Sequence, residues 1–98
     1  MNLGTLAMSL PVPPDSRTSI DWAARAEDLG YESLWIAETG GPDPYILSAL
    51  AAQVTKKARI GTAVSPIYFR TPATIASLAG TLGQVAPGRF VLGLGTSS

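Results

Sequence analysis

The feature that most constrains the fold is a unit that occurs three times: an apolar strand-like run, a short loop and a helix-like stretch. The apolar runs are Leu3–Ser9, Ser33–Glu38, Arg59–Pro66 and Phe90–Thr96. The helical stretches between them are about Ser19–Leu29, Pro44–Thr55 and Pro72–Val85. This alternation predicts an α/β fold with four parallel strands in the order 1-2-3-4, right-handed crossovers and three helices on one face. Functional groups in such folds lie at the C-terminal ends of the strands.

The predicted helix ends carry recognisable capping residues. Asp43–Pro44 and Thr71–Pro72 each combine an N-cap side chain with a proline at the first helical position. Thr18, with an aspartate three residues later, resembles a capping box for the first helix. Gly30 stands where a left-handed residue would end that helix.

Each helical stretch also carries an apolar stripe at spacings of three and four, which predicts one buried face per helix. The stripes are Ile20, Ala23, Ala24 and Leu29; Ile46, Leu47, Leu50, Ala51 and Val54; and Ile75, Leu78, Ala79 and Leu82. In the fourth strand Phe90, Leu92 and Leu94 share one face, which we expect to turn toward the helices. For Trp22 and Trp35 we expect core packing.

Composition excludes several classes of function. The chain is 46% hydrophobic and 14% charged, with a formal net charge of zero. It has no basic patch, so we expect no nucleic-acid partner. It contains no cysteine and no histidine, which removes thiolate ligands and the commonest general base, and we expect no metal site. No run approaches the roughly 18 apolar residues of a membrane span, so we expect a cytoplasmic protein without a membrane partner.

Three groups in the loops after the strands could carry chemistry. Glu38 ends the second strand and could accept a hydrogen bond from a ligand or act as a base, or it could be a solvated or capping acid. Arg70 could bind an anion, although a surface charge is the favoured interpretation. Gly93 and Gly95 place bare backbone in the fourth strand, where a ligand or another backbone could approach closely. The segment lacks the spacing of a dinucleotide-binding loop.

Several segments, in order along the whole chain, together resemble the luciferase-like monooxygenase family, and most closely its branch that uses the deazaflavin coenzyme F-420. They are Trp35–Glu38, Asp43–Pro44, Ala58–Val64, Arg70–Pro72 and Pro87–Gly95. The resemblance implies a (β/α)8 TIM barrel of roughly 250 residues or more. Residues 1–98 would then form a single N-terminal half-barrel segment of about three and a half βα units.

The resemblance also implies an activity and a coenzyme. The family performs hydride transfer or monooxygenation with a flavin or deazaflavin, here FMN or coenzyme F-420, on a small-molecule substrate. Activity of these 98 residues alone is not expected, because later strands of such barrels help to hold the coenzyme phosphates.

Particular positions match the family's site. Glu38 matches an acidic, catalytic position near the coenzyme ring, and Thr39 stands where several deazaflavin enzymes have a catalytic histidine. Ala63 and Val64 match a bond that is often a non-prolyl cis peptide behind the ring. Thr96 and Ser97 match coenzyme contacts after the fourth strand.

Two alternatives remain open at this point. The chain could be a self-associating half-barrel subunit with a binding or assembly role and no catalysis. It could also be a free-standing α/β nucleotide-binding module, which the absent phosphate loop disfavours. We expect either a homo-oligomer or a complementing C-terminal half, because the first and fourth strands would otherwise be unpaired edges. A two-fold dimer could pair these edges into a closed barrel, with Leu94 in the contact.

Overall fold

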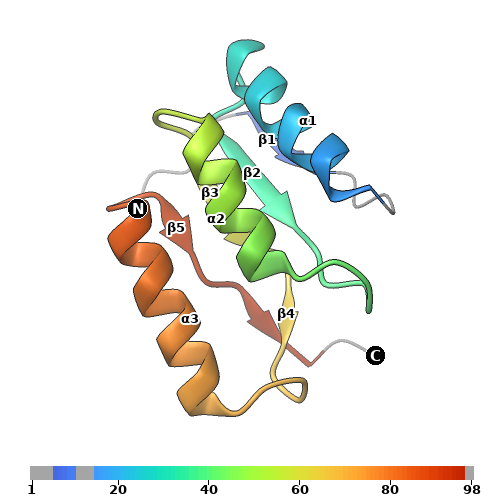
Figure 1. Cartoon of the computed structure of the whole chain (residues 1–98), viewed down its shortest axis with the longest axis vertical. Coiled ribbons are helices and arrows are strands. Elements are labelled where there is room, and N and C mark those ends of the chain that lie inside the picture. Colours follow the sequence, from blue (N-terminus) through green and yellow to red (C-terminus); the bar gives the residue numbers. More distant parts are fainter. Residues whose placement is uncertain (1–5, 11–14, 97–98) are drawn as a thin grey trace.

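The computed structural model describes residues 6–10 and 15–96 as alternating short strands and helices (Figure 1). The helices are α1 (Ser16–Asp28), α2 (Pro44–Val54) and α3 (Pro72–Val85). The strands are β1 (Ala7–Ser9), β2 (Ser33–Ile36), β3 (Arg59–Thr62), β4 (Ser65–Pro66), β5 (Phe90–Val91) and β6 (Leu94–Gly95). The predicted α/β architecture is confirmed.

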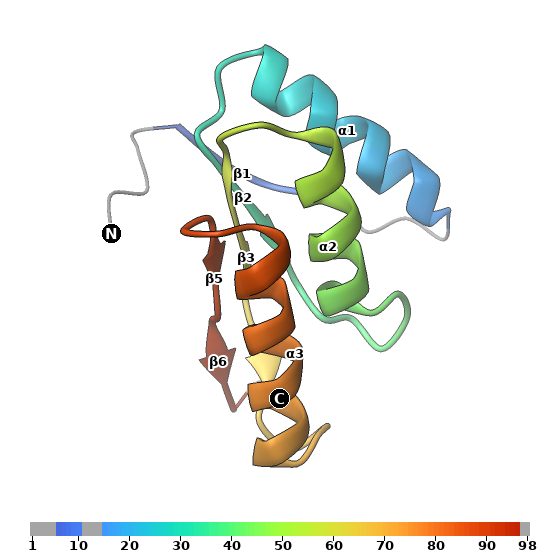
Figure 2. The ribbon, with the colours of Figure 1, turned by 60° about the vertical axis from the view of Figure 1, so that its left-hand side comes forward.

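Every strand pair in the described part of the chain is parallel. One sheet has the order β1-β2-β3-β5, and β4 pairs with β6 in a second, two-stranded sheet. Leu34 of β2 stands opposite Ile60 of β3 in the register. Figure 2 shows the three helices together on one face of these strands. The C-terminal ends of β2, β3 and β4 therefore point toward one edge of the molecule.

Two of the predicted long strands are each divided in two. The run over Arg59–Pro66 forms β3 and β4, and the run over Phe90–Thr96 forms β5 and β6. The break is filled by a side chain: Thr62 Oγ1 donates to the Gly93 carbonyl at 2.8 Å and accepts from the Gly93 amide at 2.9 Å. A side-chain hydroxyl thus takes the place of regular ladder bonds.

The break also separates Phe90 in β5 from Leu94 in β6. Leu94 is exposed, whereas Phe90 and Leu92 are half-buried. The alternation that predicts a common face for these three residues assumes one continuous strand, whereas residues 92 and 93 lie between β5 and β6.

The predicted caps are confirmed in two helices and wrong in the third. Asp43 accepts from the Ile46 amide at 2.8 Å, and Thr71 accepts from the Thr74 amide at 3.1 Å. Helix α1 begins at Ser16 rather than Ser19, because Asp15 is its N-cap and accepts from the Arg17 amide at 3.0 Å. The Asp15 carboxylate takes the role expected for the Thr18 hydroxyl. At the other end of α1, Gly30 has φ +99°, as predicted.

The core lies between the sheet and the inner faces of α1 and α2. Leu34, Ile36 and Ile60 from the strands pack with small helix residues and Leu47. Other members of the expected stripes are exposed, among them Leu29, Ile46, Leu50 and Val54. Trp22 is exposed too, so its predicted core position is wrong, whereas Trp35 is half-buried and donates to Ser33.

At the N-terminal ends of the strands, Glu27 ties α1 to the segment before β3. Its carboxylate accepts three backbone N–H groups, from Lys56, Lys57 and Ala58, at distances of 2.8 to 3.1 Å. Partial burial opposes the charged form, but these bonds and the charge of Arg89 outweigh it, so the pKa of Glu27 lies below its ordinary value. The bonds are made by the ionised carboxylate.

We expect Glu27→Gln to lower the free energy of unfolding by about 1 kcal/mol at pH 7, because an amide offers one acceptor oxygen in place of two. A lowered native pKa stabilises the fold above the ordinary value of 4.5. That stability is lost as the pH falls below this value. Urea denaturation of both proteins should therefore give a difference that shrinks on acidification. Asp28→Asn, on the same helix, is the control, and an equal loss there would contradict the assignment.

Candidate functional site

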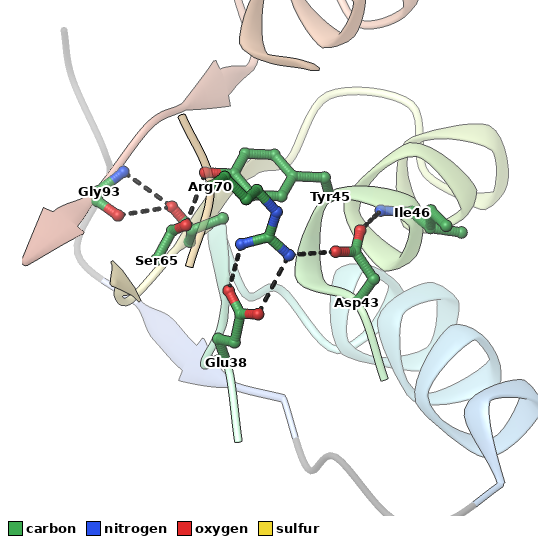
Figure 3. A network of polar contacts seen from close by, with 8 residues as sticks. Glu38, Asp43, Tyr45, Ile46, Ser65, Arg70 and Gly93 are labelled. Carbon is green, nitrogen blue, oxygen red and sulfur yellow. Dashed lines mark hydrogen bonds and ion pairs between the residues drawn. The ribbon is translucent and has the colours of Figure 1, made fainter. Parts of the chain in front are cut away.

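The loops after β2 and β4 bring three charged side chains together at the C-terminal ends of the strands. Glu38 and Asp43 belong to the loop between β2 and α2, and Arg70 belongs to the loop between β4 and α3. Arg70 lies between the two carboxylates (Figure 3). Because neighbouring parallel strands end at the same edge, their loops meet there although 32 residues separate Glu38 from Arg70.

Arg70 binds both acids through its guanidinium group. Its two terminal nitrogens donate to the two oxygens of Glu38 at 2.7 and 3.1 Å, a bidentate arrangement. One of them also donates to Asp43. The Arg70 side chain is 14% exposed and that of Glu38 is 11% exposed. The interpretation of Arg70 as a surface charge is therefore wrong.

The Tyr45 ring packs against the Arg70 guanidinium group of this ion-pair cluster. The Arg70 guanidinium carbon lies 4.8 Å from the centre of the Tyr45 ring, a distance at which the ring attracts a cation. The buried Tyr45 hydroxyl is 2.6 Å from the Ser65 hydroxyl. This contact links the first turn of α2 to β4. Because the Arg70 guanidinium lies against the Tyr45 ring, its position depends on the same contact.

The electrostatics follow from this geometry. The hydrogen bond that Arg70 donates to Glu38 is the main cause that raises the pKa of Arg70 above its ordinary value. Partial burial opposes this effect, and the bond to Asp43 adds to it. One cation faces two carboxylates, so the cluster carries a formal charge of −1. Since both oxygens of Glu38 accept from Arg70, the orientation of this carboxylate is fixed.

The described members of the predicted coenzyme site, Thr39, Ala63, Val64 and Thr96, follow the C-terminal ends of β2, β3 and β6. The Ala63 amide donates to the Ile36 carbonyl at 2.8 Å, which places Ala63 next to the end of β2. The Ala63–Val64 peptide bond is cis, as the resemblance predicted. Thr39, Ala63, Val64 and Thr96 are exposed, and Ser97 lies outside the described residues.

These residues fit the ring of a flavin-type coenzyme better than its phosphates. Ala63 and Val64 offer exposed apolar surface, and Thr39 and Thr96 offer hydroxyl groups. Gly93 and Gly95 do not leave room for a ligand. A Cβ atom at Gly93 would meet the Thr62 carbonyl, and one at Gly95 would lie 2.8 Å from a methyl group of Val64. Arg70 is already engaged by two carboxylates.

A hollow also lies at the opposite ends of the strands. It measures about 360 Å³ and is lined by Glu27, Tyr31 and Lys57, among others. The Glu27 carboxylate there already accepts three backbone N–H groups, so this end has a structural role in holding α1. In residues 6–10 and 15–96, no cluster of three potential metal ligands occurs. No helix in the same residues has the length and apolar character of a membrane span.

Sequence reasoning overlooked Tyr45 and Ser65 as members of the site, favoured a surface charge over an anion-binding role for Arg70, and assigned Asp43 a capping role alone. A signal was present: two acids follow the second strand and an arginine follows the third. Loops after neighbouring parallel strands share one edge, so opposite charges in them are placed to pair. The Tyr45–Ser65 contact has no comparable signal, because it depends on how α2 packs against β4.

The fold and this site are those of a parallel α/β protein with polar groups at the carboxyl ends of its strands. The model of the luciferase-like monooxygenase family matches residues 2–98. The chain belongs to this family.

Individual relatives agree with this assignment. An F-420-dependent glucose-6-phosphate dehydrogenase of Intrasporangium calvum is 38% identical over 90 residues, which cover 82% of this chain and 27% of the relative. The structure of the coenzyme F-420-dependent tetrahydromethanopterin reductase of Methanopyrus kandleri superposes with a TM-score of 0.83 at 30% identity, over 95% of this chain and 27% of that one.

A third relative carries FMN. It is the oxygenating constituent of the 3,6-diketocamphane monooxygenase of Pseudomonas putida, solved in complex with FMN. The TM-score is 0.81 at 28% identity, over 99% of this chain and 30% of that chain. This chain therefore spans between a quarter and a third of the length of these three relatives.

Proposed function

We propose that this chain supplies one side of the coenzyme site of a flavin- or deazaflavin-dependent oxidoreductase built on a (β/α)8 barrel. The observation that carries the proposal is the exposed Ala63–Val64 segment beside the ordered Glu38–Arg70 pair, at the C-terminal ends of the strands. Family membership supports a flavin-type coenzyme, and two of the relatives described above use F-420 while a third binds FMN. In this proposal residues 1–98 form a single N-terminal half-barrel segment of that (β/α)8 barrel.

The residues have separate roles in the proposal. Ala63 and Val64 support one face of the coenzyme ring, and Thr39, Thr96 and Ser97 provide hydroxyl groups near its polar edges. The bound coenzyme supplies hydride-transfer or oxygen chemistry. Glu38 is the candidate catalytic carboxylate. Its bidentate pairing with Arg70 supports a role in accepting a hydrogen bond from coenzyme or substrate more than a role in abstracting a proton.

We expect the 98-residue chain to bind FMN or coenzyme F-420 with a dissociation constant weaker than about 1 μM, equivalent to about −8 kcal/mol. Its described residues offer contacts to the ring, whereas Arg70 is not free to bind the phosphates. A titration followed by coenzyme fluorescence measures this constant, and comparison of the two coenzymes shows which ring is preferred. Sub-micromolar binding would contradict the division of the site between this segment and other parts of the barrel.

A matched pair of variants tests the position of the ring. Val64→Asp should raise the dissociation constant about tenfold, because it places a charge against an apolar ring face. Leu29→Asp, at an exposed position after α1, should leave the constant unchanged. Equal constants for Val64→Asp and the unaltered chain would refute the assigned position.

A further inference from the structure

The loop between β2 and α2 is held at both of its ends by one side chain. Glu38 lies just after β2, and Asp43 is the N-cap residue of α2. The Arg70 guanidinium group donates hydrogen bonds to both carboxylates and lies between them (Figure 3). The ion-pair cluster therefore closes this loop at its base, and residues 39–42 extend between two fixed points.

Asp43 uses its two carboxylate oxygens for two different bonds. Oδ2 accepts from the Ile46 amide at 2.8 Å and so caps α2. Oδ1 accepts from Arg70. The C-terminal end of the loop is thus tied to the helix and to the loop after β4 at the same time, and both bonds need an acceptor oxygen of their own.

The residues between these two ends carry hydrogen-bond donors without partners. Thr39, Gly40 and Gly41 are exposed. Within residues 6–10 and 15–96, neither their backbone amides nor the Thr39 hydroxyl donates a hydrogen bond. A Cβ atom at Gly41 would lie 3.9 Å from Thr39 Oγ1, so this hydroxyl is a neighbour of the Gly41 backbone. Gly40 has φ +85°, a left-handed conformation that can turn successive N–H groups to the same side of a loop.

The charge around these donors determines which acceptor fits them. Arg70 is bonded to two carboxylates, and the ion-pair cluster carries a formal charge of −1. Residues 37–43, 63–71 and 92–96 contain no other lysine or arginine. A phosphate group here would meet a net negative charge without a free cation. A carbonyl oxygen is uncharged and has two lone pairs, so it can accept from neighbouring N–H and O–H groups without this repulsion.

We propose that loop segment 39–41 binds an uncharged carbonyl oxygen, and that Arg70 is a positioning residue that fixes this segment for binding. The inference rests on the proposed function, which places the coenzyme ring at the same ends of the strands. Two sources supply such an oxygen: the carbonyl groups at the polar edge of a flavin-type ring, and the carbonyl group of a ketone substrate. Because the ion-pair cluster fixes the loop beforehand, little ordering entropy is lost when the oxygen binds.

NMR relaxation of the isotope-labelled chain tests the positioning role without any ligand. We expect backbone order parameters of about 0.85 at Gly40 and Gly41, the value of rigid backbone. Asp43→Asn should lower them below about 0.6. Asparagine is a good N-cap residue, so α2 is retained, but its single acceptor oxygen cannot serve both the Ile46 amide and Arg70. Asp28→Asn, at an exposed position of α1, is the matched control and should change neither value. Unchanged order parameters in Asp43→Asn would overturn the positioning role.

Three probes then test the acceptor and its source. Lumiflavin has the ring carbonyl groups without a phosphate, cyclohexanone is a simple ketone, and inorganic phosphate is the anion. We expect lumiflavin, cyclohexanone or both to shift the Gly40 and Gly41 amide signals, which identifies the source, and phosphate to leave them unchanged. In Asp43→Asn the shifts at these two amides should be about threefold smaller.

The Val64 amide separates this inference from the proposed function. If lumiflavin shifts Val64 but neither carbonyl probe shifts Gly40 and Gly41, the inference is overturned and the coenzyme site stands. If lumiflavin shifts none of the three, both are overturned. A response of Gly40 and Gly41 to phosphate alone would also overturn the inference, because it would show an anion site.

Discussion

Replacing Gly93 with alanine is expected to lower the free energy of unfolding by about 3 kcal/mol. A Cβ atom at this position would overlap the carbonyl oxygen of Thr62, which is backbone and cannot rotate away. The Gly93 amide and carbonyl are also both bonded to the Thr62 hydroxyl, so a shift of Gly93 would break the connection between β3 and the segment that joins β5 to β6. Urea denaturation at a fixed protein concentration measures the loss.

Gly83→Ala provides the control with the opposite sign. Gly83 lies inside α3, and no atom approaches within 4 Å of the position that its Cβ would occupy. Alanine there should raise the free energy of unfolding by about 0.5–1 kcal/mol, because glycine is a poor helix former. If both variants changed stability in the same direction and by similar amounts, the close approach at Gly93 would be wrong.

The second large effect is expected from Arg70→Met. This change leaves the Glu38 and Asp43 carboxylates facing one another without their shared cation. Removing one partner of a fully buried ion pair costs about 3–5 kcal/mol. Because Asp43 is 30% exposed and water screens the site, we expect a loss of about 2–3 kcal/mol here, measured by urea denaturation.

Two further variants separate charge from geometry at Arg70. Arg70→Lys keeps the cation but loses the bidentate bond to Glu38, so its stability should be intermediate. Glu38→Gln in the Arg70→Met background should recover part of the loss, because the uncompensated carboxylate is removed. Arg25→Met, on the exposed part of α1, is the control. If Arg70→Met were as mild as this control, Arg70 would be a surface charge after all.

The parallel α/β architecture could be predicted from the sequence because its signals are local. Asp43 and Thr71 cap their helices through bonds to residues three positions away, and each strand-like run is contiguous. The interruption of two strands could not be predicted in this way. It depends on hydrogen bonds between Thr62 and Gly93, which are 31 residues apart and meet only in the folded chain.

Periodicity also failed for α2 in an instructive way. This helix has no charged residue to mark its solvent side, so spacing alone does not show which side is buried. Ile46 and Leu50 were grouped with Leu47 and Ala51, although the structure turns the first two outward. For Trp22 the misleading signal was residue type: its aromatic side chain predicted burial, but it is exposed on α1.

The location of the candidate site could be predicted from the sequence, but only some of its residues could. The rule that function lies at the carboxyl ends of parallel strands placed Glu38, Ala63 and Val64 in the same region, and the structure does the same. Arg70 was assigned to the surface because its sequence neighbours reveal neither its burial nor its partners. Its two carboxylates come from a different loop, 27 and 32 residues away.

The most direct test of the proposed function is to map the coenzyme on the isotope-labelled chain by NMR. FMN and coenzyme F-420 are added in turn to millimolar excess, so that weak binding is still detected. We expect the largest amide shifts at Val64, Thr96 and Thr39, and no shifts at Lys57 and Ala58 at the opposite ends of the strands. Shifts centred on Lys57 and Ala58, or no shifts with either coenzyme, would contradict a coenzyme site at the C-terminal ends.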